Sequence, residues 1–258
     1  MDTRPIGFLD SGLGGISVLR SAVRQLPHED YLYYGDNGNA PYGDKAEAEI
    51  TRLTLICARA LVQRNVKAIV LACNTATATC IETMRDELDL PVVSVEPAIK
   101  PACSVPGNGR ILMMATLATT HLKRYLDLQS RMPDPSRVIN VPCPGLVDRI
   151  EQGIFRADAF DDLLNRYLYA YSGIQIDGIV LGCTHYIFVK QAIARYAKLH
   201  FKGPCRIYDG NDATALQLDH ILQSQHLQND RGSGKVVFLT SGEAAHYQPI
   251  FNLLFQQP

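Results

Sequence analysis

Two cysteines occupy the same position in two similar segments of the chain. Residues 67–73 read Lys-Ala-Ile-Val-Leu-Ala-Cys and residues 177–183 read Asp-Gly-Ile-Val-Leu-Gly-Cys. Polar residues follow each cysteine: Asn74 and Thr75 after Cys73, Thr184 and His185 after Cys183. The repetition predicts two similarly built lobes that each present one thiol. The alternative is that an apolar run ending in a small residue and cysteine is only a common ending of a buried strand.

A cysteine at the end of a parallel strand lies at the start of the next helix, where unpaired N–H groups and the helix dipole favour the thiolate. One such thiolate is typical of nucleophilic catalysis. Two that face a shared cleft could move a proton from one face of a carbon to the other, with one as base and the other as acid. Thr75 and Thr184 place hydroxyls beside the two sulfurs, and His185 can donate or accept a proton.

Two loops carry further polar groups. Asp10 and Ser11 end an apolar run and precede a turn at 12–15 whose glycine spacing is not the dinucleotide fingerprint. Backbone N–H groups of such a turn can bind a carboxylate, and Asp10 and Ser11 could hold an amino group and a carboxylate. The alternative for Asp10 is a helix N-cap. The loop at 35–43 ends in Pro-Tyr-Gly, which could line a pocket with backbone donors and a phenol or be an exposed turn.

The elements that must position these residues alternate along the chain. Short apolar runs predict strands at 5–9, 30–34, 68–72, 92–95, 110–115, 138–141, 178–181, 205–209 and 236–239. Amphipathic stretches predict helices at 16–25, 45–64, 77–88, 120–130, 159–171 and 188–199. This alternation indicates an α/β fold with mostly parallel sheets flanked by helices. Ligands bind such sheets at the carboxyl ends of the strands, where these residues fall.

Composition narrows the function classes. The chain has 258 residues, 47% of them hydrophobic, and a formal net charge of −1, so no basic excess favours nucleic acid or an anionic membrane. No apolar run is long enough to span a bilayer, and the first residues lack a signal-peptide plan, which predicts a cytoplasmic protein. Seven cysteines without a Cys-x-x-Cys pair argue against a disulfide framework and a structural zinc site.

In combination these motifs resemble those of the glutamate racemases, within the cofactor-independent aspartate/glutamate racemase family. The matching segments, in the family's order and spacing, are Asp10-Ser11-Gly12, Pro41-Tyr42-Gly43, Cys73-Asn74-Thr75-Ala76, Glu96-Pro97-Ala98 and Gly182-Cys183-Thr184-His185-Tyr186. Residues 115–119, Cys143-Pro144 and 150–153 are also similar. The resemblance covers about residues 6 to 216, and five ordered motifs that include both cysteines are highly specific.

The resemblance implies two α/β lobes, 1–97 with 210–258 and 98–209, with the active site in the cleft between them. It implies interconversion of L- and D-glutamate, which supplies D-glutamate for bacterial peptidoglycan synthesis, without pyridoxal phosphate, metal or ATP. Cys73 would deprotonate D-glutamate and Cys183 L-glutamate, assisted by Asp10 and His185. The implied substrate-binding residues are Ser11, Pro41, Tyr42, Gly43, Asn74, Thr75 and Thr184, together with Glu151, which would tune the second half of the site.

Some features depart from the family pattern or leave alternatives open. Ile187 replaces the usual proline after the second cysteine motif, and residues 145–150 are more polar than the family's usual apolar run before Glu151. A related two-cysteine enzyme on the same scaffold is one alternative: an aspartate or hydantoin racemase, or a maleate isomerase. A binding protein without turnover is another, although both cysteines and their partners are intact. Homodimers of this family occur in more than one arrangement, and no exposed apolar stripe in the sequence selects one.

Overall fold

The computed structural model describes residues 1–256 and divides the chain into two compact units. The first unit contains Met1–Glu96 and the segment from Gly210 onward, and the second contains Pro97–Asp209. All strand pairs in the two sheets are parallel. The predicted α/β class with parallel, helix-flanked sheets is confirmed. No helix within residues 1–256 combines the length and apolar character needed to cross a bilayer.

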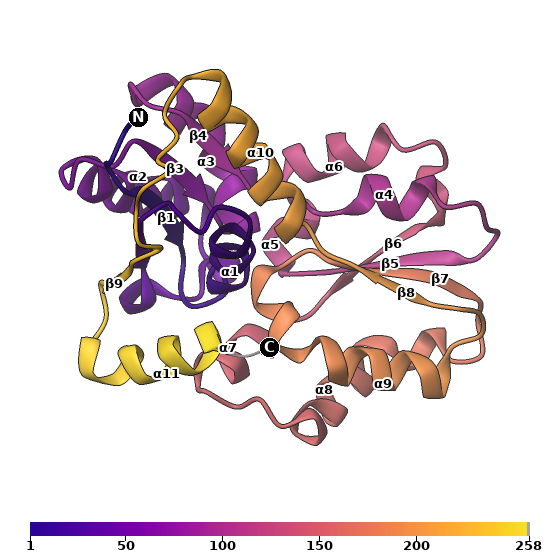
Figure 1. Cartoon of the computed structure of the whole chain (residues 1–258). Helices are drawn as coiled ribbons and strands as arrows, with labels where there is room; N and C mark the ends of the chain where they lie inside the picture. The colour runs from indigo at the N-terminus through magenta and orange to yellow at the C-terminus, as the bar shows by residue number, and fades with distance from the viewer. Residues whose placement is uncertain (257–258) are drawn as a thin grey trace. The chain divides into compact units, whose positions relative to one another are not determined.

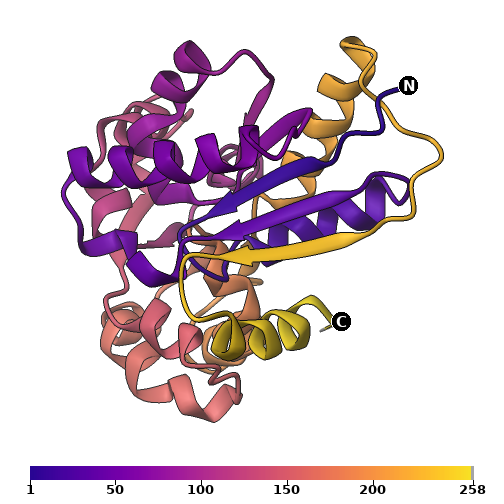
Figure 2. The same cartoon turned by 90° about the vertical axis from the view of Figure 1, so that its left-hand side faces the viewer.

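The first unit is built on a five-stranded sheet in the order β4-β3-β1-β2-β9. Figure 1 labels β1, β3, β4 and β9 of this sheet. Its strands are β1 (Ile6–Asp10), β2 (Tyr31–Gly35), β3 (Ala68–Leu71), β4 (Val92–Ser94) and β9 (Val236–Thr240). Its helices are α1 (Ile16–Gln25), α2 (Glu47–Val62), α3 (Asn74–Glu87), α10 (Asn211–Ser224) and α11 (Ala244–Gln256). Helix α1 packs against α10 and α11, and α2 packs against α3. Figure 2 shows β9, from the end of the chain, beside β2 at the sheet edge.

The second unit has a four-stranded sheet in the order β6-β5-β7-β8. Its strands are β5 (Arg110–Ala115), β6 (Val138–Pro142), β7 (Ile176–Leu181) and β8 (Arg206–Tyr208). Its helices are α4 (Ile99–Ser104), α5 (Leu117–His121), α6 (Lys123–Ser130), α7 (Leu146–Glu151), α8 (Asp161–Leu168) and α9 (Lys190–His200). Strand β5 has two buried faces, because Leu112 and Met114 belong to the core under α7, α8 and α9, while Ile111 and Met113 belong to the core with α4 and α6.

Both sheets change their winding direction at one point. In the first unit the chain moves from β1 outward to β2 and then returns past β1 to β3, so neighbouring strands β1 and β3 lead into connections on opposite faces. In the second unit β5 and β7 stand in the same relation. A crevice forms at the carboxyl ends of such a strand pair, and ligands of parallel sheets bind there. Asp10 is the last residue of β1, while Cys73 follows β3 and Cys183 follows β7.

The strands agree with the sequence prediction more closely than the helices do. All nine predicted strands are present, with ends that differ by up to two residues. The helix predicted at 120–130 is instead two helices, because Leu122 has extended backbone geometry (φ −69°, ψ 134°) between α5 and α6. Four helices were not predicted: α4, α7, α10 and α11.

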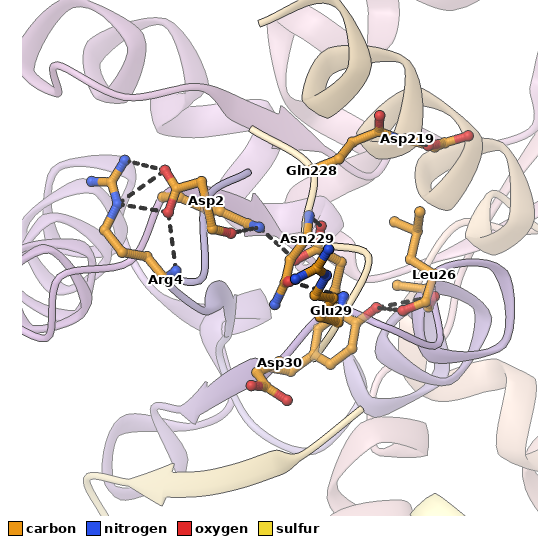
Figure 3. Close-up of polar contacts among 12 residues, drawn as sticks. Asp2, Arg4, Leu26, Glu29, Asp30, Asp219, Gln228 and Asn229 are labelled. Atoms are coloured by element: carbon orange, nitrogen blue, oxygen red, sulfur yellow. Dashed lines mark hydrogen bonds and ion pairs between the residues drawn. The ribbon is translucent and has the colours of Figure 1, made fainter. Parts of the chain in front are cut away.

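A buried ion pair holds the amino-terminal end of the first sheet. Lys67 Nζ lies 2.5 Å from Glu29 Oε2, with 0% and 2% of the two side chains exposed. The ammonium also donates to the carbonyl oxygen of Asp2 at 2.7 Å, and the other Glu29 oxygen accepts the N–H of Asn229 at 2.8 Å (Figure 3). This pair therefore joins the first residues of the chain to the segment that leads into β9.

Lys67→Met is expected to destabilise the fold by about 3–5 kcal/mol, because it leaves the Glu29 carboxylate buried without its cation. Urea unfolding followed by circular dichroism measures the loss. The matched control is Arg59→Met, which removes the cation of the exposed pair Arg59–Glu87 and should cost at most about 1 kcal/mol. Equal losses of unfolding free energy in the two variants would show that the buried pair stabilises the fold no more than the exposed pair does.

Candidate active site

Cys73 begins helix α3 of the first unit. It is the N-cap residue, and its Sγ accepts the N–H of Ala76 at 3.5 Å. The thiol also donates to Ser11 Oγ at 3.4 Å, which joins the residues after β3 to those after β1. The cysteine is 5% exposed. The structure thus places Cys73 and Ser11 in contact at the N-terminus of a fourteen-residue helix, where negative charge is favoured.

Asp10 lies at the end of the neighbouring strand β1. Its buried carboxylate accepts the N–H of Gly12 at 2.7 Å. The N-cap of α1 is Gly15, without a side-chain hydrogen bond, so the alternative of Asp10 as a helix cap is wrong. A side chain at Gly15 would place its Cβ 2.8 Å from the Cβ atoms of both Asp10 and Ala72, so glycine lets the turn pack against these two strand ends.

The Pro-Tyr-Gly segment differs from the simple exposed turn that was the alternative. Tyr42 is buried, and its phenol donates to Asp36 Oδ2 at 2.6 Å. Burial and this bond to a carboxylate hold the pKa of the phenol well above its usual range. The phenol therefore supports the loop from inside. The first N–H groups of the short helix Tyr42–Asp44 that follows Pro41, among them that of Gly43, have no acceptor within the helix and can serve as donors.

Asn74 and Thr75 are the first residues of α3, directly after Cys73, and both are buried. Asn74 is 6% exposed, and its Oδ1 atom has no hydrogen-bond partner among residues 1–256. A buried acceptor without a donor costs about 1–3 kcal/mol. A ligand that carries N–H donors at this position would remove that cost.

The second unit brings three predicted residues together. His185 Nδ1 lies 3.6 Å from Cys183 Sγ, and His185 Nε2 lies 2.6 Å from Glu151 Oε1. Cys183 is 7% exposed and His185 is buried. Glu151 ends α7, and the two other residues follow β7, so two elements supply this chain of contacts. Thr184, which stands between Cys183 and His185 in the sequence, is also buried.

The environment of His185 favours its charged form. Burial alone would lower the pKa of the imidazole, but the hydrogen bonds to Cys183 and Glu151 more than offset it and hold the pKa well above its usual value. The imidazolium then lies between a carboxylate and a sulfur. This arrangement is suited to a thiolate that accepts a proton and returns it.

The surroundings of Cys183 differ from those of Cys73. Cys183 precedes a six-residue 3-10 helix, Thr184–Val189, and does not cap it through its side chain. The continuous helix predicted from residue 188 begins at Lys190 instead. The helix-terminus argument made for both thiols therefore applies in full to Cys73 only, and the polar contact of Cys183 is the one with His185 Nδ1 at 3.6 Å.

Two threonines that the sequence reasoning did not assign lie at the same edge of the second sheet. Thr116 and Thr119 follow β5, the partner of β7, and their hydroxyl oxygens lie 2.9 Å apart. Residues 115–119 resembled the family, but that resemblance gave these threonines no role. The strand order shows that they lie at a possible ligand-binding edge, because the winding of this sheet reverses between β5 and β7. Among residues 1–256, no group of three or more His, Cys, Asp or Glu side chains is placed to hold a metal ion.

Known proteins are similar to this chain in sequence and in fold. Residues 6–218 match the family model described as Asp/Glu/Hydantoin racemase. The glutamate racemase of Clostridium novyi is 41% identical over 236 residues, which cover 90% of each chain. The structure of the Francisella tularensis glutamate racemase with D-glutamate superposes with a TM-score of 0.85 at 27% identity, covering 100% of this chain and 95% of that one.

The structure of the Escherichia coli glutamate racemase with L-glutamate and the activator UDP-MurNAc-ala gives a TM-score of 0.82 at 28% identity, with 97% and 95% of the two chains covered. The family match spans both units and both cysteine segments. The chain belongs to the Asp/Glu/hydantoin racemase family.

Proposed function

We propose that this chain interconverts L- and D-glutamate by a two-base mechanism that uses Cys73 and Cys183 and needs no cofactor. The observation that carries the proposal is that each unit places one buried cysteine after a strand at which the sheet reverses its winding. Relatives about 40% identical over nine-tenths of the chain are glutamate racemases. The product D-glutamate would supply bacterial peptidoglycan synthesis.

In this mechanism each cysteine exchanges a proton with one face of the substrate's α-carbon. The Cys73 thiolate takes the α-proton of D-glutamate, and the Cys183 thiol delivers its proton to the other face, which yields L-glutamate. The reverse reaction begins with the Cys183 thiolate. One thiolate and one thiol remain after each turnover, with their roles exchanged. Asp10 assists the first thiol, and His185, held by Glu151, assists the second.

The polar groups around Cys73 fit an amino acid substrate. The unpartnered Oδ1 of Asn74 would accept from the α-ammonium group. The N–H groups of Tyr42 and Gly43 and the hydroxyl groups of Ser11 and Thr75 would donate to the two carboxylates. Thr184, next to Cys183 in the sequence, would supply a further hydroxyl donor from the second unit. Maleate carries no N–H donor, so this acceptor favours an amine-bearing substrate over that of a maleate isomerase.

Incubation with D-glutamate in D2O tests the proposal. We expect deuterium at the α-carbon by proton NMR and a decay of optical rotation to zero, because protonation on the opposite face uses solvent-derived deuterons. The same result is expected when the reaction starts from L-glutamate. It is also expected after the enzyme has been dialysed against a chelator and treated with a carbonyl reagent, because the proposed mechanism needs neither a metal nor pyridoxal phosphate. Glutamate that keeps its α-proton and its rotation would contradict the proposal.

A substrate panel separates glutamate from the substrates of related enzymes. The same measurement with aspartate, a 5-substituted hydantoin and maleate should give kcat/KM values well below that for glutamate. Faster turnover of any of these would reassign the substrate while leaving the two-cysteine chemistry in place. No turnover of any substrate would favour a binding protein on this fold.

A further inference from the structure

The last strand of the first unit ends against the loop that carries Pro41, Tyr42 and Gly43. Ser241 directly follows β9, and its hydroxyl donates to Asp36 Oδ1 at 2.5 Å. The hydroxyl oxygen of Ser241 in turn accepts the N–H of Gly38 at 3.0 Å. Beside it, Thr240 Oγ1 donates to Asn37 Oδ1 at 2.8 Å. A turn formed by Thr240, Ser241 and Gly242 thus binds the loop at 36–39, although about 200 residues separate them in sequence.

Asp36 connects this turn to Tyr42. The carboxylate is 1% exposed and accepts from the Tyr42 phenol at 2.6 Å, from Asn39 Nδ2 at 3.0 Å and from the Ser241 hydroxyl. A buried carboxylate is tolerated when hydrogen-bond donors surround it, and none of these three donors carries a positive charge. Removal of one donor therefore leaves the buried Asp36 carboxylate less stabilised, and this carboxylate orients Tyr42 through the bond to its phenol.

The backbone of the loop is equally close to the turn. A side chain at Gly38 would place its Cβ 2.9 Å from the carbonyl oxygen of Ser241, so only glycine permits this approach. The N–H of Ser241 also donates to the carbonyl oxygen of Gly35 at 3.1 Å, which continues the ladder between β9 and β2. The loop is therefore held through its backbone at Gly38 and through its carboxylate at Asp36 by a single residue, Ser241.

We propose that Ser241 is a positioning residue for substrate binding, which acts through Asp36 and the loop backbone on the donors of Tyr42 and Gly43. The proposal rests on the function proposed above, because it assigns these donors to the substrate's carboxylate. Ser241 itself touches no reacting atom. The carboxyl-terminal segment thereby contributes to the affinity for substrate, while the chemistry at Cys73 stays with β1 and β3.

Three variants test this role. Ser241→Ala removes the hydroxyl, and Ser241→Thr retains it. Ser233→Ala is the matched control, because Ser233 makes a serine–aspartate bond to Asp30 at 3.1 Å at the other end of β9. We expect Ser241→Ala to raise the KM for glutamate about tenfold, the size expected for the loss of one hydrogen bond to a charged group, with kcat within about twofold of the parent. Ser241→Thr should restore the parent KM.

Hydrogen exchange provides a second readout that does not depend on turnover. Mass spectrometry should show faster amide exchange at residues 36–44 in Ser241→Ala and parent-like exchange there in Ser241→Thr and Ser233→Ala. An unchanged KM together with unchanged exchange in Ser241→Ala would overturn the proposal, as would an equal rise of KM in Ser233→Ala. If the parent fails to racemise glutamate while Ser241→Ala still loosens the loop, the proposed substrate is wrong but the hold on the loop remains.

Discussion

Cys73→Ser and Cys183→Ser are each expected to abolish racemisation while leaving the fold intact. A serine hydroxyl has nearly the volume of a thiol but is far too weak an acid to exchange a proton with the α-carbon at neutral pH. General acid–base groups contribute about 10²–10⁴-fold each, so we expect the rate to fall by about 10³-fold or more in either variant. Circular dichroism of glutamate solutions measures the change in both directions.

The control for this pair is Cys205→Ser. Cys205 is a free, partly buried cysteine of the second unit, and burial raises the pKa of its thiol to about 11, so it has no base function at neutral pH. This variant should retain the parent rate. A single variant at Cys73 or Cys183 that racemises glutamate near the parent rate would refute the two-base assignment.

Glu151→Gln is expected to reduce activity at the basic end of the pH range. The bonds to Glu151 and Cys183 raise the pKa of His185, so its imidazolium persists above the pH at which an ordinary histidine is neutral. A neutral amide lowers that pKa, and the imidazolium is then lost at a lower pH. We expect kcat/KM for L-glutamate to fall about 10²-fold above the ordinary histidine pKa of about 6.5, with little loss below it.

The pH dependence of kcat/KM, measured from both enantiomers, checks this shift. Glu87→Gln makes the same chemical change in the exposed pair with Arg59 and should leave the profile unchanged. A loss of equal size at every pH would mean that Glu151 only supports the packing of α7. A basic limb that moves to higher pH would contradict the sign of the argument.

The strands were predictable because their signal is local. Runs such as Ile-Val-Leu at 69–71 and 179–181 are apolar on consecutive residues, which is typical of a strand buried on both faces. The positions of Asp10, Cys73 and Cys183 followed, since polar residues that come directly after such runs lie at the carboxyl edge. The reversal of winding did not follow, because strand order depends on which strands pair.

The missed helices have weak or misleading local patterns. Helix α11 contains Pro249 and is apolar on most of its positions, so it shows neither a clear polar face nor an uninterrupted run of helix-forming residues. It is held by packing, because Phe251 stacks on Phe238 of β9, with 4.5 Å between the ring centroids. Helices α4 and α7 have six residues each, too few to establish a periodic pattern.

Contacts between residues that are far apart in the sequence could not be predicted from local sequence patterns. The bond between Glu151 and His185 joins two elements, and the bond between Asp36 and Ser241 joins the second strand to the last. The resemblance named Glu151 but gave no partner for it. One of the two interpretations of the loop at 35–43 gave a phenol to a pocket, whereas the phenol of Tyr42 donates to the buried carboxylate of Asp36.

The interrupted first unit has a consequence for biosynthesis. Its sheet receives β9 from the end of the chain, while the second unit is one continuous stretch, Pro97–Asp209. Translation therefore completes the second unit first, and the first unit must wait for the final residues before its edge strand can pair. Because domains begin to fold as they leave the ribosome, residues 1–96 spend that interval with the outer edge of β2 unpaired. An open strand edge can pair with other chains, so this interval is when the nascent protein is most exposed to misassembly and chaperone binding.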